Sequence, residues 1–392
     1  MPKVYFSEDD MCTTQKLQIA RVQNWFIANG WEVTENPELA DMPIALTCNG
    51  WKLLTENSFK RIERLQNLGL SENLVVFGCV NDAHPKRVSS VHTGQTISNA
   101  KIDEQIDSLL PDAAIPFADI PHSSEFRTKE DYRIYDLSKQ FVNIANGCSF
   151  NCSFCHHKPG LGDRRSRTKE DILQQVEKLV KKMNIRIIVL TGMETSFYGH
   201  EHGTNFAELL EEVLNIDENF EVHIAQFQPQ GLHKMSDKLA ELVQNKRITD
   251  FQLPIQTTSS RILKMMKRAD RTSLVGPFIE KIRERNNRVI MRTDLIVGWP
   301  TETYEELDDS LAFAVKHFDE IAVYAIELDP DLPAWKYKSE EFSEKERNLR
   351  VRYAREFIER HGKMAHCGQQ DDATMAEVEE MRQKMRKLRG VA

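Results

Sequence analysis

The order of apolar and polar residues predicts strands that alternate with helices. Three apolar runs have the length of buried strands: residues 3–6, 43–46 and 74–77. Residues 14–30, and a second stretch that runs to Leu68, carry apolar side chains at helical spacing, and each ends at a glycine. Residues 31–33 resume as a strand. Because such alternation is typical of parallel sheets, residues 1–110 are expected to form a Rossmann-like parallel-sheet domain.

The alternation returns beyond residues 111–136, where prolines and mixed charges predict a linker. Strands are expected from residue 142 onward and at residues 186–190, 221–225, 250–255, 289–296 and 321–326. Helices are expected between them, including residues 169–183, 204–214 and 259–267. Six β/α units over residues 137–340 predict a partial (β/α)6 barrel with its chemistry at the carboxyl ends of the strands. Residues 341–392 are rich in Glu, Lys, Arg, Met and Ala and predict a helical, charged tail, so the fold class is α/β.

Composition narrows the class of protein. A hydrophobic share of 40% and a charged share of 29% are typical of a globular chain of 392 residues. No stretch approaches the ~20 apolar residues of a membrane span, and the charged start is unlike a signal peptide. We therefore expect a cytoplasmic protein without a membrane partner. The formal net charge of −8 disfavours a large basic surface for nucleic acid.

Three cysteines lie within eight residues and carry the most specific chemistry in the chain. Cys148, Cys152 and Cys155 follow the spacing C-x3-C-x2-C, which a tight loop can gather at one point. Thiolates are ligands of iron–sulfur clusters, and three of them leave one iron of a 4Fe–4S cluster without a protein ligand. That iron can bind S-adenosylmethionine (SAM), whose S–C bond is broken after electron transfer. The spacing resembles the signature of the radical SAM superfamily, including the aromatic Phe154 between the last two cysteines.

A structural zinc site is the alternative for this triplet, with His156 or His157 as fourth ligand.

Three further cysteines follow predicted strands of the first domain. Cys12 comes after the first strand, and Cys48 and Cys79 come directly after later strands. Because the carboxyl ends of parallel strands line one edge of a sheet, these thiols are expected to converge there. Seven cysteines in a chain without an export signal favour reduced thiols and metal binding. We predict a second 4Fe–4S cluster here, against the alternative that each cysteine is a small buried hydrophobe. Cys367 is expected to be an ordinary thiol.

One short motif has no assigned function. Asp82-Ala83-His84-Pro85-Lys86-Arg87 is similar to the D-x-H-x-x-G pattern of cobalamin-binding domains, but Arg87 stands in place of the glycine. We interpret the match as chance.

Residues 1–350 as a whole resemble the radical SAM methylthiotransferase family, whose members attach methylthio groups to tRNA bases or a ribosomal protein. The ordered segments that carry the resemblance are Phe77-Gly78-Cys79, the triplet with its continuation to Arg167, Leu190 to Gly199, Leu253 to Arg268, and Arg292 to Thr303. The chain departs from the family at Cys12 and after Cys48, where the usual Val-Arg is replaced by Asn49-Gly50-Trp51. The family's carboxyl-terminal TRAM barrel has no counterpart in the charged tail.

The resemblance implies two 4Fe–4S clusters and SAM as cofactors. Residues expected to contact SAM are Phe154, Arg165, Arg167, Glu194, Gln256, Gly298 and Pro300; for each of them a structural role is the alternative. Asp294 is expected to orient the substrate or to cap a turn. No catalytic residue is assigned.

The resemblance further implies an enzyme that inserts a methylthio group at an unactivated C–H bond. Without the TRAM barrel, and with an acidic balance, a peptide, protein or small-molecule substrate is favoured over tRNA. The same clusters would also serve methylation or plain sulfur insertion, and a non-catalytic cluster protein is the alternative from another class. Expected partners are a sulfur source and a reductant such as flavodoxin or ferredoxin.

Overall fold

The computed structural model describes residues 1–7, 11–124 and 139–367, and divides the chain into two units. The first unit comprises residues 1–128 together with two short segments of the cysteine triplet region, residues 146–150 and 155–165. The second unit holds residues 129–145, 151–154 and 166–392. Cys148 and Cys155 thus belong to the first unit and Cys152 to the second.

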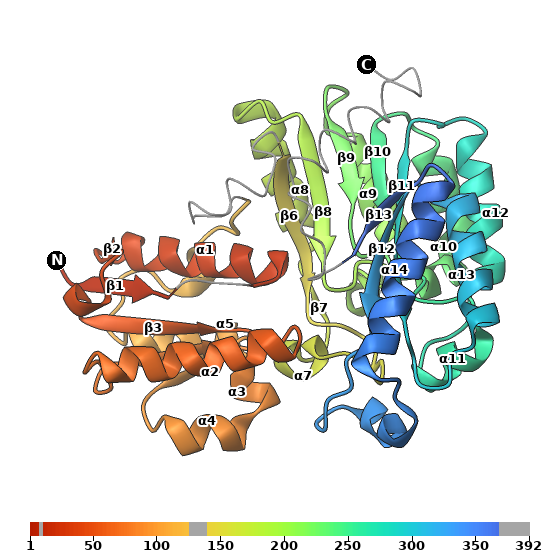
Figure 1. The fold of residues 1–392 in the computed structure, drawn as a ribbon. Coiled ribbons are helices and arrows are strands. Elements are labelled where there is room, and N and C mark those ends of the chain that lie inside the picture. Colours follow the sequence, from red (N-terminus) through yellow and green to blue (C-terminus); the bar gives the residue numbers. More distant parts are fainter. Residues whose placement is uncertain (8–10, 125–138, 368–392) are drawn as a thin grey trace. The chain divides into compact units, whose positions relative to one another are not determined.

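The first unit is built on a five-stranded parallel sheet (Figure 1). Its strands are β1 (Lys3–Phe6), β2 (Glu32–Thr34), β3 (Met42–Thr47), β4 (Val75–Gly78) and β5 (Thr96–Ser98), in the spatial order β2-β1-β3-β4-β5. Its helices are α1 (Thr13–Ala28), α2 (Lys52–Asn67), α3 (Val80–Ala83), α4 (Pro85–Val91), α5 (Ile102–Gln105) and α7 (His157–Leu161), with short 3-10 turns at Pro37–Leu39, Ile106–Leu109 and Phe117–Asp119. This order is that of a doubly wound α/β sheet, which confirms the expected Rossmann-like class.

Helices cover both faces of this sheet. Figure 1 shows α1 and α2 on opposite sides of it. Trp25 and Phe26 of α1 pack in one apolar cluster with the sheet, and Ile62 and Leu65 of α2 pack in another. Both helices end where glycine takes a left-handed backbone, as at Gly30 with φ of 81°. Burial on both faces explains why these strands are continuous apolar runs rather than alternating ones.

The expected linker begins inside this unit. Phe117 and Ile120 are buried in the same apolar cluster as α1, and the Arg21 guanidinium donates to both of their carbonyl oxygens. Residues 125–136 of the expected linker lie outside the described residues. Residues 117 and 120 therefore pack with the first sheet, and the boundary at 110 stays a prediction.

The second unit is built on an eight-stranded sheet with the order β13-β12-β11-β10-β9-β8-β6-β7. Its strands are β6 (Lys139–Asn146), β7 (Arg165–Ser166), β8 (Ile187–Gly192), β9 (Glu221–Ile224), β10 (Ile248–Gln252), β11 (Ile290–Val297), β12 (Glu320–Ala325) and β13 (Met364–His366). Its helices are α8 (Lys169–Glu177), continued by a π turn (Lys178–Lys182), α9 (Phe206–Leu214), α10 (Leu232–Val243), α11 (Ser260–Met265), α12 (Thr272–Arg283), α13 (Tyr304–His317) and α14 (Glu344–Arg360), with 3-10 turns at His200–His202, Pro229–Gly231 and Pro333–Glu340.

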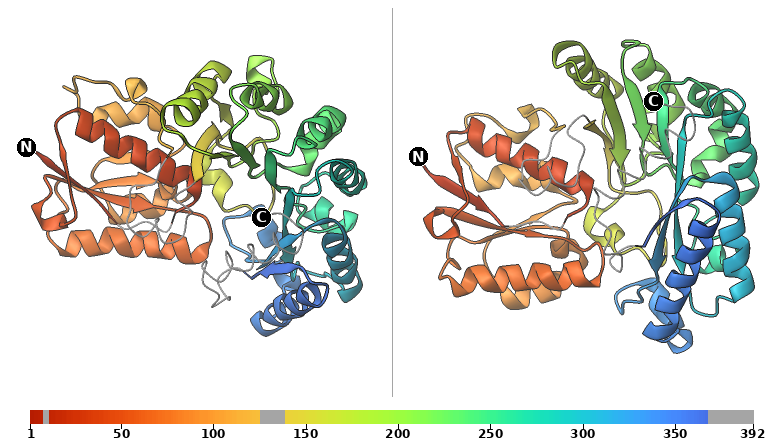
Figure 2. Two further views of the ribbon diagram at one scale, coloured as in Figure 1. Left: turned by 90° about the horizontal axis from the view of Figure 1, so that it is seen from above. Right: turned by 45° about the horizontal axis from the view of Figure 1, so that its top comes forward.

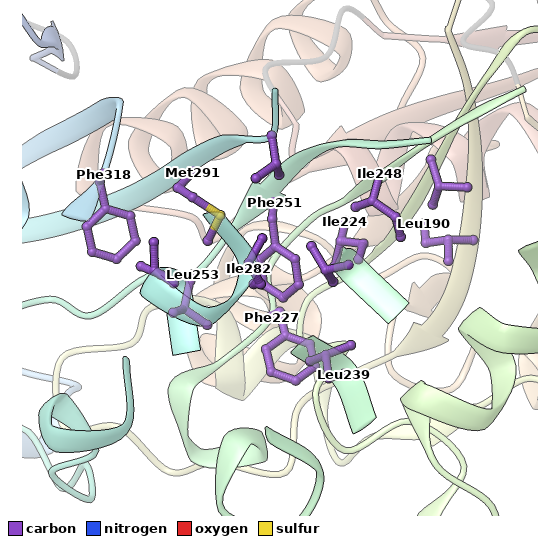
Figure 3. Packing of buried hydrophobic residues seen from close by; sticks show 14 of the residues in the cluster. Leu190, Ile224, Phe227, Leu239, Ile248, Phe251, Leu253, Ile282, Met291 and Phe318 are labelled. Carbon is purple, nitrogen blue, oxygen red and sulfur yellow. The ribbon is translucent and has the colours of Figure 1, made fainter. Parts of the chain in front are cut away.

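All pairings from β6 through β8 to β13 are parallel, and Figure 2 shows helices along the outer face of the curved sheet. The large apolar core lies between these two layers. Phe227, Phe251 and Phe278 stack edge to face at its centre (Figure 3 labels the first two). The predicted partial barrel is thereby confirmed.

The region beyond residue 340 contains one element that the sequence did not indicate. Helix α14 agrees with the expected helical tail, but β13 then adds a parallel edge strand next to β12. Cys367, which follows β13, is buried in the main core, and residues 368–392 lie outside the described residues. Within the described residues, no helix combines the length and apolar character needed to cross a membrane.

Candidate cofactor sites

Cys12, Cys48 and Cys79 gather at one edge of the first sheet. Cys12 caps the start of α1, Cys48 follows β3, and Cys79 follows β4. Strand β1 lies next to β3, and β3 next to β4, so the three loops leave neighbouring strand ends. The order in which strands are added to the sheet reverses between β1 and β3, and ligands of doubly wound sheets bind in the crevice at that point. The structure thus places the three predicted ligands together where a ligand is expected.

The Gln15 side chain links two of these cysteines and was missed by sequence reasoning. Its amide nitrogen lies 2.8 Å from the Cys79 sulfur, and its amide oxygen lies 3.6 Å from the Cys12 sulfur. Backbone N–H groups of Gln15 and Thr14, at the amino end of α1, also face the Cys12 sulfur. The N–H groups would favour a thiolate, because hydrogen bonds and a helix amino end stabilise negative charge, whereas the Gln15 amide oxygen accepts from the neutral Cys12 thiol.

Burial opposes that charge. It raises the pKa of all three thiols, that of Cys48 to about 12. The neighbouring cysteines add to the increase, since the Cys12 thiolate raises the pKa of both Cys48 and Cys79. Three sulfurs that repel each other's charge are stable as thiolates only beside a cation, and a metal centre deprotonates its thiol ligands. This donor set fits an iron–sulfur cluster.

A single metal ion fits less well. Among residues 1–7, 11–124 and 139–367, no three His, Cys, Asp or Glu side chains gather closely enough to hold one ion. A 4Fe–4S cluster differs because each thiolate binds a different iron, so its ligands stand further apart.

The first unit holds two of the triplet cysteines in a tight loop. The Cys148 sulfur accepts from the Phe150 N–H at 3.4 Å. Lys158 Nζ binds the Cys148 carbonyl oxygen at 2.6 Å and Asp163 at 2.7 Å. A Cβ on Gly147, whose φ is 71°, would come within 2.1 Å of the Asp163 carbonyl oxygen, so only glycine fits that turn. The loop is shaped by its backbone and one lysine rather than by helix or strand.

The second unit holds the middle cysteine through a turn that follows α11. Ser153 donates from its N–H and its hydroxyl to the carbonyl oxygens of Met266 and Met265. Arg268 extends from the same turn, and its Nη1 lies 4.0 Å from the Cys152 sulfur. Its other nitrogen binds Gln228 and the Pro254 carbonyl oxygen. Arg268 therefore places a fixed positive charge beside a predicted cluster ligand, a role that the sequence did not reveal.

Phe154 and the segment from Gly298 to Pro300 come together in this unit. The Phe154 ring packs edge to face on Trp299, with centroids 6.1 Å apart. The Gly298 N–H donates to buried Glu302 at 2.8 Å, and Arg350 lies 3.2 Å from the same carboxylate. This pair fixes the turn after β11, next to the predicted aromatic contact.

The carboxyl ends of three neighbouring strands carry strained backbone. Gln226, Gln256 and Thr301 all have positive φ, from 54° to 69°, shortly after β9, β10 and β11. Non-glycine residues rarely take this conformation, and they do so preferentially at functional sites. Gln256 is held there by backbone bonds with Asp294 and Ile296 of β11. The contact of Gln256 with SAM stays a prediction.

The remaining residues predicted to contact SAM differ in burial and in how many hydrogen bonds their side chains make within the protein. Glu194 is fully buried after β8 and accepts from the Ser196 hydroxyl and the Phe197 N–H, both at 2.7 Å. Arg165 is exposed. Arg167 is buried and binds Asp171, Gln175 and the Asn143 carbonyl oxygen, so its guanidinium mainly braces β6 against α8.

The sheet face opposite the main core carries polar groups that sequence reasoning did not combine. On β11, Met291, Leu295 and Val297 belong to the core, whereas Arg292 and Asp294 point to the other face. Two other acids on this face have nearby partners: Arg292 pairs with Asp250 at 2.6 Å, and the His366 ring lies 3.5 Å from Glu320. The alternation of apolar and polar residues along β11 was the sequence signal that could have revealed this polar face.

Asp294 lacks such a partner. The Gln252 amide donates to its carboxylate at 3.1 Å, and no ion pair joins it to a cation within the part of the chain that the structure describes. Burial raises the pKa of Asp294 to about 6. A carboxylate with a single amide donor retains acceptor capacity for a substrate.

Sequence comparisons match both units. The radical SAM superfamily profile matches residues 142–314, and the profile of the uncharacterized protein family UPF0004 matches residues 10–97. A probable threonylcarbamoyladenosine tRNA methylthiotransferase of Methanocaldococcus jannaschii is 29% identical over 306 residues, which cover 76% of this chain and 70% of the relative. The ribosomal protein uS12 methylthiotransferase RimO of Prochlorococcus marinus (strain MIT 9301) is 29% identical over 340 residues, which cover 83% and 72%.

A solved structure agrees with the fold. The radical SAM methyltransferase TsrM from Kitasatospora setae has a TM-score of 0.63 over 85% of this chain and 77% of its own, at 14% identity. That identity supports the shared fold alone. Two domains match in the expected order, and relatives span both of them. The chain carries a radical SAM domain and is similar over both units to the radical SAM methylthiotransferases, transferases whose cofactors are S-adenosylmethionine and 4Fe–4S clusters.

Proposed function

We propose that this enzyme holds two 4Fe–4S clusters and inserts sulfur, as a methylthio group, at an unactivated C–H bond of a protein or peptide. The observation that carries the proposal is the gathering of Cys12, Cys48 and Cys79 at neighbouring strand ends of the first sheet. A radical SAM domain alone needs only the triplet of Cys148, Cys152 and Cys155. A second trio of thiols has no use in SAM cleavage, but it suits a separate sulfur site.

When bound, the triplet's cluster supplies the electron that cleaves SAM, and the second cluster supplies a binding place for the transferred sulfur. The residues of the chain bind and orient SAM and the substrate. We assign SAM to the strand ends of the second unit, with contacts from Phe154, Glu194, Gln256, Gly298 and Pro300; a contact from Arg165 stays a prediction. Arg167 holds β6 against α8. Asp294, positioned by Gln252, accepts hydrogen bonds from the substrate.

The proposed class of substrate is based on the substrates named for the relatives and on the net charge of the chain. One relative is named for tRNA and the other for a ribosomal protein. The net charge of −8 favours the protein class, because RNA binding needs clustered cations. A small molecule remains within the same chemistry, and tRNA is the alternative. We place the reaction in the cytoplasm with a flavodoxin or ferredoxin as reductant and a separate sulfur source, since cysteines that bind clusters must stay reduced.

Iron content tests the two-site arrangement. The chain is expected to bind about eight irons after anaerobic reconstitution, four for each cluster. Replacing Cys148, Cys152 and Cys155 together with Ala should leave about half. A triple variant that keeps the full iron content, or a wild-type chain that never exceeds one cluster's worth, contradicts the proposal.

The division of labour is tested with Cys48→Ala. This variant should still release 5′-deoxyadenosine from SAM under dithionite, whereas no methylthio product should form. Product mass separates methylthio transfer from methylation and from plain sulfur insertion. If the folded variant no longer cleaves SAM, the trio is not a separate site; if the wild-type enzyme never cleaves it, the non-catalytic alternative gains support.

A further inference from the structure

Asn49 occupies a buried junction in the first unit. Its side-chain nitrogen donates to the His156 carbonyl oxygen at 2.6 Å. Its side-chain oxygen accepts from the Thr55 hydroxyl at 2.9 Å and bonds to His84 Nε2 at 2.8 Å. One carboxamide therefore connects the loop after β3, the helix α2, the end of α3, and the segment that carries Cys155. Only 4% of Asn49 is exposed, so solvent offers no replacement for these bonds.

The backbone of Asn49 reaches the other predicted cluster site. Its N–H faces the Cys79 sulfur, and its neighbour Cys48 belongs to the same trio. Asn49 thus contacts a predicted ligand of one cluster through its backbone. Through its side chain it contacts the residue that follows a predicted ligand of the other.

Two glycines allow residues 155–165 to approach the loops that carry Cys48 and Cys79. A Cβ on Gly160 would lie 2.3 Å from the Cys79 Cβ, so α7 can pack against Cys79 only with glycine at that position. A Cβ on Gly50 would lie 3.3 Å from His157 Nε2 and 3.5 Å from the Cys48 sulfur. Residues 155–165 therefore rest on both the Cys48 loop and the Cys79 loop. The contact uses Asn49-Gly50-Trp51, the stretch at which this chain departs from the family's usual Val-Arg.

We propose that Asn49 is a positioning residue that couples the site of Cys12, Cys48 and Cys79 to the segment carrying Cys155, so that filling this site orders that segment. This inference rests on the proposed two-site function. Ligation at the first site fixes the Cys48 and Cys79 loops, and the Asn49 carboxamide passes that order to the His156 carbonyl.

The test separates this bond from the rest of the junction. Asn49→Asp keeps both acceptor contacts, with Thr55 and His84, but places an oxygen against the His156 carbonyl oxygen where a donor stood. Thr55→Val is the matched control because it removes a different bond to the same Asn49 and leaves the link intact. Both changes are made in the full chain that carries Ala at Cys148, Cys152 and Cys155, so that iron loads only at the first site.

Hydrogen–deuterium exchange of residues 156–165 is then compared with and without iron. Loading should slow exchange about tenfold in the parent and in Thr55→Val, and should have no effect on the segment in Asn49→Asp. Equal slowing in Asn49→Asp overturns the coupling, whereas a parent that binds no iron overturns the two-site function instead. In the enzyme with all cysteines, Asn49→Asp should keep wild-type iron content but alter the electron paramagnetic resonance signal recorded with SAM; an unchanged signal also contradicts the proposal.

Discussion

Arg268 places a positive charge beside the Cys152 sulfur, and charge near a cluster changes its reduction potential. Because reduction adds negative charge, the arginine should favour the reduced cluster. Arg268→Gln is therefore expected to lower the midpoint potential. A loss of about 1 kcal/mol of charge interaction corresponds to about 40 mV for a one-electron couple. A redox titration followed by electron paramagnetic resonance measures the change, and Arg268→Lys, which keeps the charge, should shift less. Equal potentials in all three proteins would deny Arg268 this role.

Asp294 gives a pH dependence that can be assigned to one residue. Its pKa rises from 3.8 to about 6 in the folded chain, so the folded state holds the proton more tightly than the unfolded state. That stabilisation is fully present below pH 3.8 and is lost as pH rises through 6. Asp294→Asn should remove this loss. Relative to wild type, the variant should gain up to about 3 kcal/mol in free energy of unfolding between pH 4 and pH 7. Denaturant titrations of the metal-free, SAM-free protein measure the gain, and parallel pH profiles for the two proteins would contradict the assignment.

At the scale of elements, helix α7 depends on one glycine. A Cβ at position 160 would meet the Cα and Cβ of Cys79 within 2.8 Å, which neither backbone nor side chain can avoid without moving. Gly160→Ala should therefore displace Cys79 and reduce iron binding by about half, the share of one cluster. Iron analysis after reconstitution provides the measurement.

Gly30→Ala serves as the control for this prediction. No atom lies within 4 Å of its added Cβ, although its φ of 81° makes alanine strained. It should lose stability but keep its iron. Full iron binding in Gly160→Ala would show that α7 and Cys79 can separate without cost to the site.

The sequence predicted those elements whose pattern spans many residues. Strands β1, β3 and β4 are buried on both faces, and β6 and β8 to β12 alternate with long helices, so each left a clear apolar run or period. Strands β5 and β13 have three residues each, too few for a period, and β13 follows a highly charged helix. Phe117 and Ile120 lie among prolines and acids, so their burial depends on α1, a contact distant in sequence.

The residues of the cofactor sites also divide into those that the sequence pattern could predict and those that it could not. The cysteines were predictable because a cluster restricts residue type and spacing, whether within the triplet or at strand ends. Gln15, Asn49 and Arg268 were not, because their roles depend on contacts with residues 64, 107 and 116 positions away. Arg167 shows the reverse case, since a motif position expected to contact SAM is used mainly to hold β6.

For the whole molecule, the open question is the class of substrate. An RNA-binding enzyme collects phosphates with clustered Lys and Arg, and its affinity falls steeply with salt. This chain has 60 acidic and 52 basic residues, and its basic stretch from Arg382 to Arg389 lies outside the described residues. That stretch contains no aromatic side chain for stacking on unpaired bases. We therefore expect only weak, salt-sensitive binding to bulk tRNA and a protein or peptide as the methylthio acceptor.

The measurement that separates the two classes is the modified-nucleoside profile of tRNA from cells with and without the gene. The profile should be unchanged by deletion, while the masses of proteolytic peptides from the same cells should reveal a methylthio group that disappears. Complementation with Cys48→Ala is the control, because that variant should cleave SAM without transferring sulfur. A methylthiolated nucleoside that is lost on deletion, and restored by the intact gene but not by Cys48→Ala, would assign the enzyme to tRNA. The proposed sulfur site of Cys12, Cys48 and Cys79 would still hold in that case, because either acceptor requires it. Only the surface that binds the substrate would need to be reassigned.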